Sequence, residues 1–374
     1  MDRRMKLSGT IFALSLVVVM AIAVADTTKP ANLAASLTAG KVQLKSAGAL
    51  AFGPDGVLFV GDSTGSSIAE IDTNDHTAGS SGKVNVEGID AKIAALVGVA
   101  PDQIMINDVK VNPISKNVYL SASRGRGPEA TPLIVKVNAA GEVTSLSLDN
   151  VKHASVSITD APASNPSARQ DPRMMTITDM SYVNGTLMVA GLSNEEWSSA
   201  LRSIPVPFKT ASEGATLQIW HSSHGRYETA SPVRSFVPYT ISGQQFILAA
   251  YTCTPLVKIP VSDLKPGSKV KGATIADLGS GNQPLDMVPY KKDGHNFILI
   301  ANTSLGLVKL QADTLESYSA IDSPTKVSGA AGVPYDKISD VKNVRQLARF
   351  DDTQALVLTA KPTSPMNLQT IALP

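Results

Sequence analysis

A hairpin pattern recurs six times along this chain, and it limits the possible fold more than any other feature. Each copy has a short apolar strand, a tight turn rich in Gly, Asp or Asn, and a second apolar strand. The first copy, Ala49–Asp62, reads ALAFGPDGVLFVGD, and the others begin at Asp108, Asp179, Ser235, Asp286 and Gln346. Apolar β-formers on both sides of such turns predict β-hairpins.

A third apolar strand follows the hairpin in several copies, at 67–71, 133–137, 256–259 and 307–310. The copies start 51 to 71 residues apart, which suits four-stranded sheets joined by loops of variable length. Such sheets bury both of their faces when they pack on one another around an axis. We therefore predict an all-β, six-bladed β-propeller. A seven-bladed alternative requires an extra unit hidden in 73–105 or 150–176.

The last copy leaves room for only about three strands before the chain ends at Pro374. The strand-like segment 41–45, which reads KVQLK, precedes the first copy. We expect this N-terminal strand to close the last blade, because a closed ring has no exposed sheet edge. Residues 38–374 are then a single propeller domain.

The first 25 residues have the features of a secretory signal peptide. Arg3, Arg4 and Lys6 form a positive region before the apolar run 11–24, and Ala23-Val24-Ala25 supplies a small-x-small cleavage pattern. We expect cleavage before Asp26, a linker over 26–37, no membrane span after cleavage, and a periplasmic or secreted protein.

Charge and cysteine content narrow the range of partners. The full chain has a formal net charge of +1, and removing residues 1–25 leaves it nearly neutral, so we expect no nucleic-acid partner. Cys253 is the only cysteine, so an intramolecular disulfide is impossible and the packed core must hold the fold together.

The segment AFGPDGVLFVGD resembles the recurring hairpin of the NHL and SMP-30-like β-propeller superfamily. The resemblance extends over roughly 40–374 and concerns architecture. It implies a propeller, but not one activity, because the superfamily contains lactonases, lyases, quinoprotein-like enzymes and pure binding scaffolds.

Asp108, Asp179 and Asp286 occupy the same position in their copies, at the start of the innermost strand. They are expected to ring the mouth of the central channel, beside Ala49, Ser235 and Gln346. Two interpretations remain open. The carboxylates could hold a Ca²⁺-type divalent cation, with Asn302, Asn194 and Glu195 as further oxygen donors; the resemblance implies a divalent ion near this point. Alternatively each Asp accepts hydrogen bonds from backbone N–H groups of the neighbouring blade, which we favour.

Several long connections are expected on the same face as these aspartates, namely 73–105, with a short helix over 88–97, and 124–131, 150–176 and 194–213. Cys253 follows a second strand and is expected on that face too, as a buried thiol, a nucleophile or a soft-metal ligand. His221 and His224 form an H-x-x-H that we place in a solvated turn on the opposite face.

Long loops on one face of a rigid scaffold favour binding there. Our leading hypothesis is an exported propeller that binds a small molecule or a protein partner at the channel mouth, through Asp108, Asp179, Asp286, Asn302, Cys253, Asn194 and Glu195. The alternatives are a metal-dependent hydrolase or lactonase, in which the aspartates hold the ion, and a quinoprotein-like oxidoreductase. The sequence contains no nucleophile elbow and no phosphate-binding glycine loop.

Overall fold

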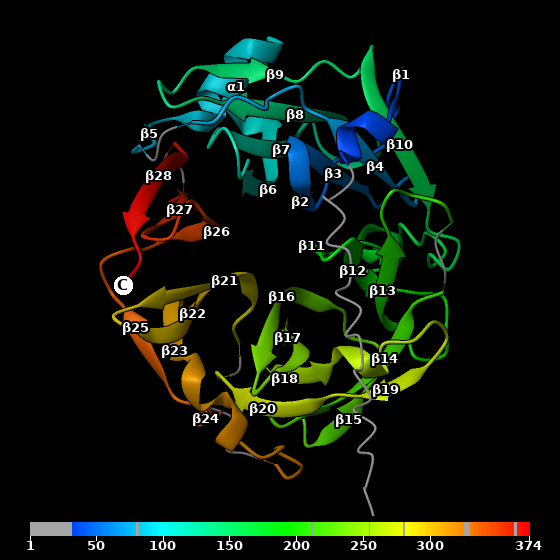
Figure 1. Cartoon of the computed structure of the whole chain (residues 1–374), viewed down its shortest axis with the longest axis vertical. Helices are drawn as coiled ribbons and strands as arrows, with labels where there is room; N and C mark the ends of the chain where they lie inside the picture. The colour runs from blue at the N-terminus through cyan, green and yellow to red at the C-terminus, as the bar shows by residue number, and fades with distance from the viewer. Residues whose placement is uncertain are drawn as a thin grey trace, which may run out of the picture. The chain divides into compact units, whose positions relative to one another are not determined.

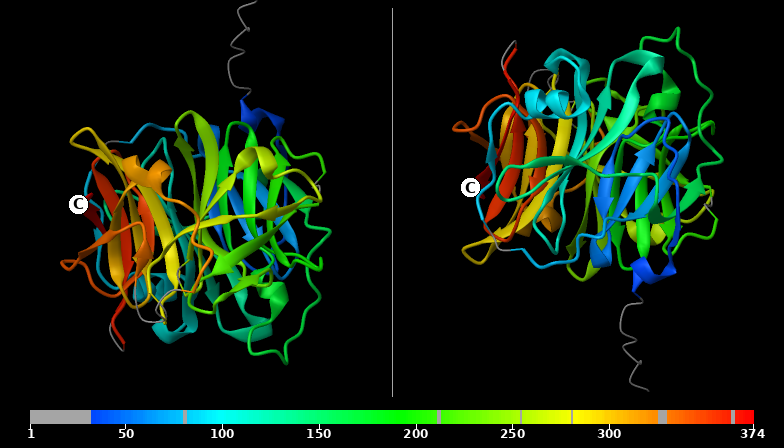
Figure 2. Two further views of the ribbon diagram at one scale, coloured as in Figure 1. Left: turned by 90° about the horizontal axis from the view of Figure 1, so that it is seen from below. Right: turned by 90° about the horizontal axis from the view of Figure 1, so that it is seen from above.

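Six mainly antiparallel sheets stand around a common axis in the computed structural model, and in each sheet the first strand of the repeated hairpin is innermost (Figure 1). The structure describes residues 32–79, 82–210, 213–253, 255–279, 281–324, 330–362 and 365–374, and the chain from Asn32 to Pro374 forms one compact unit. The side views show the sheets standing side by side within a thick disc (Figure 2). The predicted six-bladed propeller is therefore confirmed. The expected signal peptide lies outside the described residues.

We number the blades 1 to 6 by their repeat copies. Blade 1 contains β2 (Leu50–Phe52), β3 (Val57–Asp62), β4 (Ser67–Asp72), β10 (Val151–Ser157) and β1 (Thr38–Gly40). Blade 2 contains β6 (Ile104–Val111), β7 (Val118–Arg124), β8 (Thr131–Val137) and β9 (Val143–Ser145). Blade 3 contains β11 (Asp179–Val183), β12 (Thr186–Leu192), β13 (Ser199–Pro205), β14 (Ala215–His221) and β15 (Arg226–Glu228), with β19 (Lys269–Lys271) parallel to β14.

Blade 4 contains β16 (Val233–Ile241), β17 (Gln244–Tyr251), β18 (Pro255–Pro260), β20 (Ala273–Asp277) and β24 (Ala331–Gly332). Blade 5 contains β21 (Pro284–Lys292), β22 (His295–Asn302), β23 (Gly306–Gln311) and β25 (Tyr335–Ile338). Blade 6 contains β26 (Val344–Arg349), β27 (Gln354–Thr359), β28 (Asn367–Ala372) and β5 (Asn85–Val86). The helical segments are α1 (Ile89–Val97), η1 (Leu33–Ser36), η2 (Pro54–Gly56), η3 (Pro101–Gln103), η4 (Gly127–Glu129), η5 (Pro172–Met175), η6 (Val261–Asp263) and η7 (Ala312–Ser317).

The turns between first and second strands have the geometry that their residues predict. In blades 3, 4 and 5 the pairs Asn184-Gly185, Ser242-Gly243 and Asp293-Gly294 all have positive φ, between 47° and 86°. Two consecutive residues with positive φ form the turn whose twist matches that of the flanking strands. These short turns fix the register of each hairpin.

The blades do not follow one another around the ring in sequence order. The innermost strand β2 packs between β6 and β11, and β6 packs between β2 and β26, so the spatial order is 2, 1, 3, 4, 5, 6 (Figure 1). Six clusters of buried apolar residues follow the same order, one between each pair of neighbouring blades. The chain leaves blade 1 after β4, builds blade 2, and returns with β10 to the outer edge of blade 1.

An N-terminal segment completes the last blade, as predicted, but it is not 41–45. The closing strand is β5, where Val86 pairs with Leu368 and Asn85 with Gln369. Residues 41–45 form no strand. Val42 is buried instead between blades 1 and 2, and its N–H donates to Leu148 O at 2.8 Å. The prediction for 41–45 was wrong. A single apolar residue among lysines and glutamine, Val42, does not indicate between which two blades it will be buried.

The long connections differ in what they contain. The helix expected over 88–97 is α1, and 124–131 is a connection with η4. The connection 150–176 contains strand β10 as well as η5. The segment 194–213 is not a loop insertion, because it contains β13, the third strand of blade 3. Consequently β14 is the fourth strand, and His221 at its end lies on the channel-mouth face rather than on the opposite one.

Part of the predicted N-terminal linker belongs to the packed core of the propeller. Leu33, Ala34 and Leu37, in the predicted linker 26–37, are buried between blades 1 and 3.

Among the described residues, no helix is both long and apolar enough to cross a bilayer.

The closure by β5 predicts where an engineered disulfide will form. We expect Asn85→Cys with Gln369→Cys, in a Cys253→Ser background, to oxidise readily, because directly paired antiparallel residues have the Cα spacing that a disulfide needs. The bridge closes a loop of most of the domain, so it should stabilise the oxidised form by about 4–5 kcal/mol over the reduced form in urea unfolding. Lys45→Cys with Gln369→Cys is the control and should stay reduced; the reverse result would refute closure by β5.

Candidate functional site

The innermost strands share an irregularity where they enter the channel. In β6, β16, β21 and β26 the register with the second strand shifts just before Asp108, Ser235, Asp286 and Gln346, respectively. Such a bulge bends the strand and turns the next side chain away from its regular direction. The bulged residues Asn107, Arg234 and Leu285 line the channel mouth together with the aspartates.

Each of the three aspartates bridges to the next blade through a backbone N–H. Asp108 Oδ2 accepts from Leu50 N of blade 1 at 2.7 Å. Asp179 Oδ2 accepts from Phe236 N of blade 4 at 2.9 Å, and Asp286 Oδ2 accepts from Leu347 N of blade 6 at 3.0 Å. These charge-assisted bonds have the geometry of the structural interpretation that the sequence favoured.

In the spatial order of the blades, the three bridges join blades 2 and 1, 3 and 4, and 5 and 6. They therefore alternate around the ring. Other side chains join two of the remaining interfaces: Gln346 Nε2 donates to Asn107 O of blade 2 at 2.9 Å, and Ser63 Oγ donates to Ile177 O before blade 3 at 3.2 Å. The channel mouth is thus a belt of side-chain bonds between sheets that share no backbone ladder.

A lysine ammonium occupies the space between the carboxylates. Lys110 Nζ lies 2.9 Å from Asp108 Oδ1 and 3.3 Å from Asp286 Oδ1. Burial lowers the pKa of Lys110, but the charges of Asp108, Asp286 and Asp179 outweigh burial and hold it above its ordinary value. Lys110 is therefore a fixed cation at the centre of the acidic ring.

One lysine does not balance three carboxylates, and their pKa values reflect this. Burial raises the pKa of Asp286 to about 7 and that of Asp179 to about 6, although the charge of Lys110 opposes both shifts. The neighbouring aspartates raise both values further, because like charges in one buried site disfavour ionisation.

The donor set does not fit a calcium ion. Ca²⁺ takes six to eight oxygen ligands, but here Oδ1 of Asp108 and Oδ1 of Asp286 already bind the Lys110 ammonium, and Asp179 Oδ1 accepts from the backbone N–H of Met180. The opposite oxygens bind backbone N–H groups. A dication would have to displace a buried ammonium from the same carboxylates, so the ring is built around Lys110 itself.

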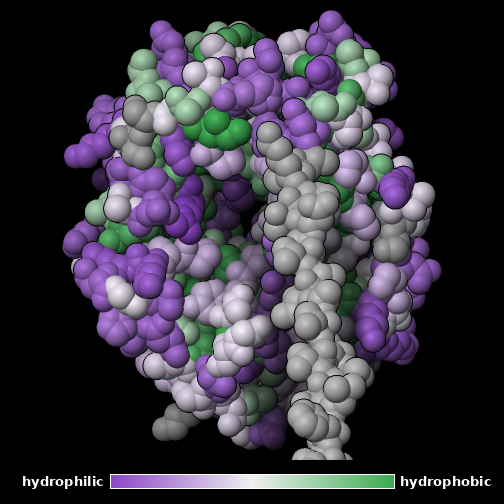
Figure 3. Space-filling model, in the orientation of Figure 1, coloured by the Kyte–Doolittle hydropathy of each residue, from purple (hydrophilic) through white to green (hydrophobic). Residues whose placement is uncertain are grey.

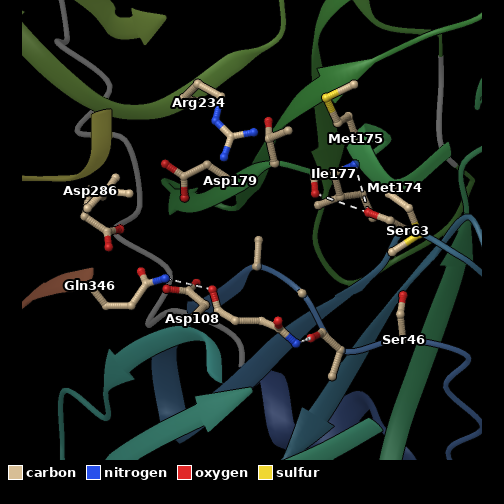
Figure 4. Close-up of a pocket in the computed structure, with 16 residues that line it drawn as sticks. Ser46, Ser63, Asp108, Met174, Met175, Ile177, Asp179, Arg234, Asp286 and Gln346 are labelled. Atoms are coloured by element: carbon tan, nitrogen blue, oxygen red, sulfur yellow. Dashed lines mark hydrogen bonds between the residues drawn. The ribbon is translucent and has the colours of Figure 1, made fainter. Parts of the chain in front are cut away.

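A cavity of about 320 Å³ opens above this ion cluster (Figure 4). Asp108, Asp179 and Asp286 project into a common space, with the Arg234 guanidinium beside Asp179. Further lining residues include Ser46, Ser63, Asn107, Met174, Met175, Ile177, Thr178 and Gln346. A second cavity, of about 210 Å³, lies against Lys110, Asp179 and Asp286, so the ion cluster separates two spaces along the channel. Figure 3 shows the face seen in Figure 1, largely hydrophilic and hollowed near the centre of the ring.

The other residues predicted for the mouth lie elsewhere. Asn302 is buried and its Oδ1 accepts from Asn282 Nδ2 at 3.0 Å. Asn194 and Glu195 are exposed, and Asn194 N donates to Asp160 O at 2.8 Å. Cys253 lies on the same face, but within the described residues none of these four lines the mouth cavity.

Sequence reasoning missed four residues of the channel mouth: Lys110 of the ion cluster, and Arg234, Met174 and Met175, which line the cavity. Lys110 stands two residues after Asp108 in the same strand, so both side chains face the channel, and this alternation was the available signal. Arg234 directly precedes the repeat position of Ser235, but the bulge that turns it inward has no marker in the sequence. Met174 and Met175 belong to η5 in the connection 150–176, whose course depends on tertiary packing.

Comparisons with known proteins leave the family open. No protein-family model matches the chain, and no curated protein matches it. Among solved structures, a glucose dehydrogenase is 14% identical over 90% of this chain and 100% of its own, with a TM-score of 0.37. A PQQ-bound aldose sugar dehydrogenase from Streptomyces coelicolor is 11% identical over 90% of this chain and 96% of its own (TM-score 0.31). A luciferin-regenerating enzyme is 9% identical over the same shares (TM-score 0.27). These likenesses concern the fold and carry no argument about function.

The raised carboxyl pKa values predict how stability depends on pH. Asp179 and Asp286 bind protons more tightly in the folded state than in the unfolded state, where Asp titrates near pH 3.9. Their contribution is full below about pH 4 and is lost as pH rises through about 6 to 7. We expect the free energy of unfolding in urea to fall between pH 5 and pH 8.

Asp286→Asn should reduce that slope by up to about 1.4 kcal/mol per pH unit, because one titrating group is removed while an oxygen remains for Leu347 N. It should not abolish the slope, since burial also raises the pKa of Glu70 to about 7. Asp336→Asn, at an exposed position of the same blade, is the control and should leave the slope unchanged. An equal slope in Asp286→Asn and wild type would contradict the assignment.

Proposed function

We propose that this chain binds a small molecule rich in hydroxyl or amino groups in the mouth cavity. The observation that carries the proposal is the convergence of three carboxylates, the Arg234 guanidinium and two amides in one recess. Polar groups brought together from several blades, over a rigid ion cluster, are the usual composition of a binding site.

The chemistry of the lining favours a ligand with many hydrogen-bond donors. A carboxylate accepts about four hydrogen bonds, and Asp286 accepts two, from Leu347 N and Lys110 Nζ. Arg234 supplies donors: with the Gln283 amide oriented to suit both groups, Gln283 Oε1 accepts from Arg234 Nε and Nη2 at 2.8 Å each. Within the part of the chain that the structure describes, the other N–H groups of the guanidinium remain for a ligand oxygen. A hydroxyl group matches both kinds of partner, because it donates and accepts.

The size of the mouth cavity and the residues at its rim favour a small ligand over a protein partner. A volume of about 320 Å³ lies at the lower end of the range for ligand pockets. Met174 and Met175 of η5 form part of the rim, and Met174 is 51% exposed. Methionine side chains adapt to the shape of what they contact. The polar groups lie inside the recess, where a protein surface would not reach all of them.

The two enzymatic alternatives have less support. A calcium-dependent hydrolase needs an ion between Asp108, Asp179 and Asp286, where Lys110 stands. For a quinoprotein-like oxidoreductase, no residue of the mouth cavity supplies specific support.

Calorimetry with a panel of monosaccharides, polyols, polyamines and dicarboxylates tests the proposal. We expect a polyol, sugar or amine to bind and the dicarboxylates to fail, because three carboxylates line the cavity. Arg234→Gln should lower the affinity for a hydroxylated ligand by about 10- to 100-fold, because charged hydrogen bonds to it are lost. Arg124→Gln, at an exposed position in blade 2, is the matched control. Binding of dicarboxylates alone, or equal affinity in wild type and Arg234→Gln, would overturn the proposal.

A further inference from the structure

A second cluster of reactive side chains lies outside the mouth cavity, where blade 3 meets blade 4. His221 ends β14, His224 lies in the turn after it, and Cys253 follows β17. One ring nitrogen of each histidine and the Cys253 sulfur all lie within 4.8 Å of one another. The sequence prediction placed the two histidines on the opposite face from Cys253, because it did not recognise β14 as the fourth strand of its blade.

Glu228 fixes the orientation of both histidine rings. Its Oε2 lies 2.7 Å from His221 Nδ1, and its Oε1 lies 2.7 Å from His224 Nδ1. A ring that donates from Nδ1 to a carboxylate presents an unprotonated Nε2, and this is the arrangement by which carboxylates orient metal-binding histidines. One glutamate therefore prepares two Nε2 lone pairs.

Buried polar atoms at this place lack partners. His221 is 2% exposed, and its Nε2 has no hydrogen-bond partner among the described residues. The same holds, within that part of the chain, for Ser222 Oγ, Ser223 Oγ and Asp277 Oδ2. The Asp277 carboxylate lies against the backbone N–H of Ser223, which stands between the two histidines in the sequence. A buried polar atom without a partner costs stability, so several together indicate a bound ion or water.

We propose that His221, His224 and Cys253 bind a zinc-type divalent transition metal ion. Two imidazoles and one thiolate are the donors that Zn²⁺ prefers. Around tetrahedral Zn²⁺, such donors lie about 3.3–3.6 Å apart, so side-chain shifts on the order of 1 Å from the present spacing would complete the site. Three protein ligands leave the fourth position of a tetrahedral ion open. The site is separate from the mouth cavity and does not depend on the function proposed there.

Metal titration of the full chain, after treatment with a chelator, tests this inference. We expect one Zn²⁺ per chain by calorimetry, and one Co²⁺ that shows the visible absorption of a tetrahedral ion and a thiolate-to-metal charge-transfer band. Cys253→Ser should remove that band. Glu228→Gln should weaken binding by about 10- to 100-fold, through loss of ring orientation.

His224→Gln is the decisive variant, because the His224 side chain is 44% exposed and its loss should not disturb folding. It should weaken metal binding by at least tenfold with an unchanged circular dichroism spectrum. His295→Gln is the matched control: His295 Nδ1 also lies close to a carboxylate, 3.0 Å from Asp313 Oδ2, and it is not part of the cluster. Wild type that fails to bind Co²⁺, binds it without the charge-transfer band, or binds it as tightly as His224→Gln would overturn the inference.

Discussion

The bond between an inner-strand aspartate and the backbone N–H of the neighbouring blade is the interaction on which this structure depends. Blades of a propeller share no backbone ladder, so apolar packing and side chains must fix how one sheet stands against the next. Asp108, Asp179 and Asp286 do so at alternate interfaces, all in the same direction around the ring. Lys110 binds two of them directly, Asp108 and Asp286, and its charge also favours the ionised form of Asp179, so one ammonium offsets part of the cost of burying three carboxylates.

The path of the chain adds a second constraint. Blade 2 is built between the third and outer strands of blade 1, and β5 completes blade 6. Three blades are therefore interlocked by segments from the N-terminal half of the domain. Both the closing strand and the connection that carries Met174 and Met175 follow from this path, so the same detour that seals the ring also shapes the rim of the mouth cavity.

The sequence predicts what depends on local pattern and misses what depends on partners. All six hairpins and the convergence of Asp108, Asp179 and Asp286 followed from turn residues and repeat positions. The closing strand did not, because β5 is only Asn85–Val86 and has no periodicity to detect. The third strand of blade 3 was missed since Ser199–Pro205 contains a buried Arg202, which pairs with Asp160 and hides the apolar pattern. Because this strand was missed, the next one, β14, was expected to end on the opposite face, and His221 was predicted far from Cys253.

Amide hydrogen exchange of the full chain tests the central role of Lys110 most directly. The N–H groups of Leu50, Phe236 and Leu347 each bind one aspartate, at three different interfaces. In wild type they should exchange only through global unfolding. In Lys110→Met all three should exchange faster together, because the carboxylates that hold them lose their shared counter-charge. Acceleration of Leu50 alone, or of none of the three, would contradict the view that one lysine unites the ring.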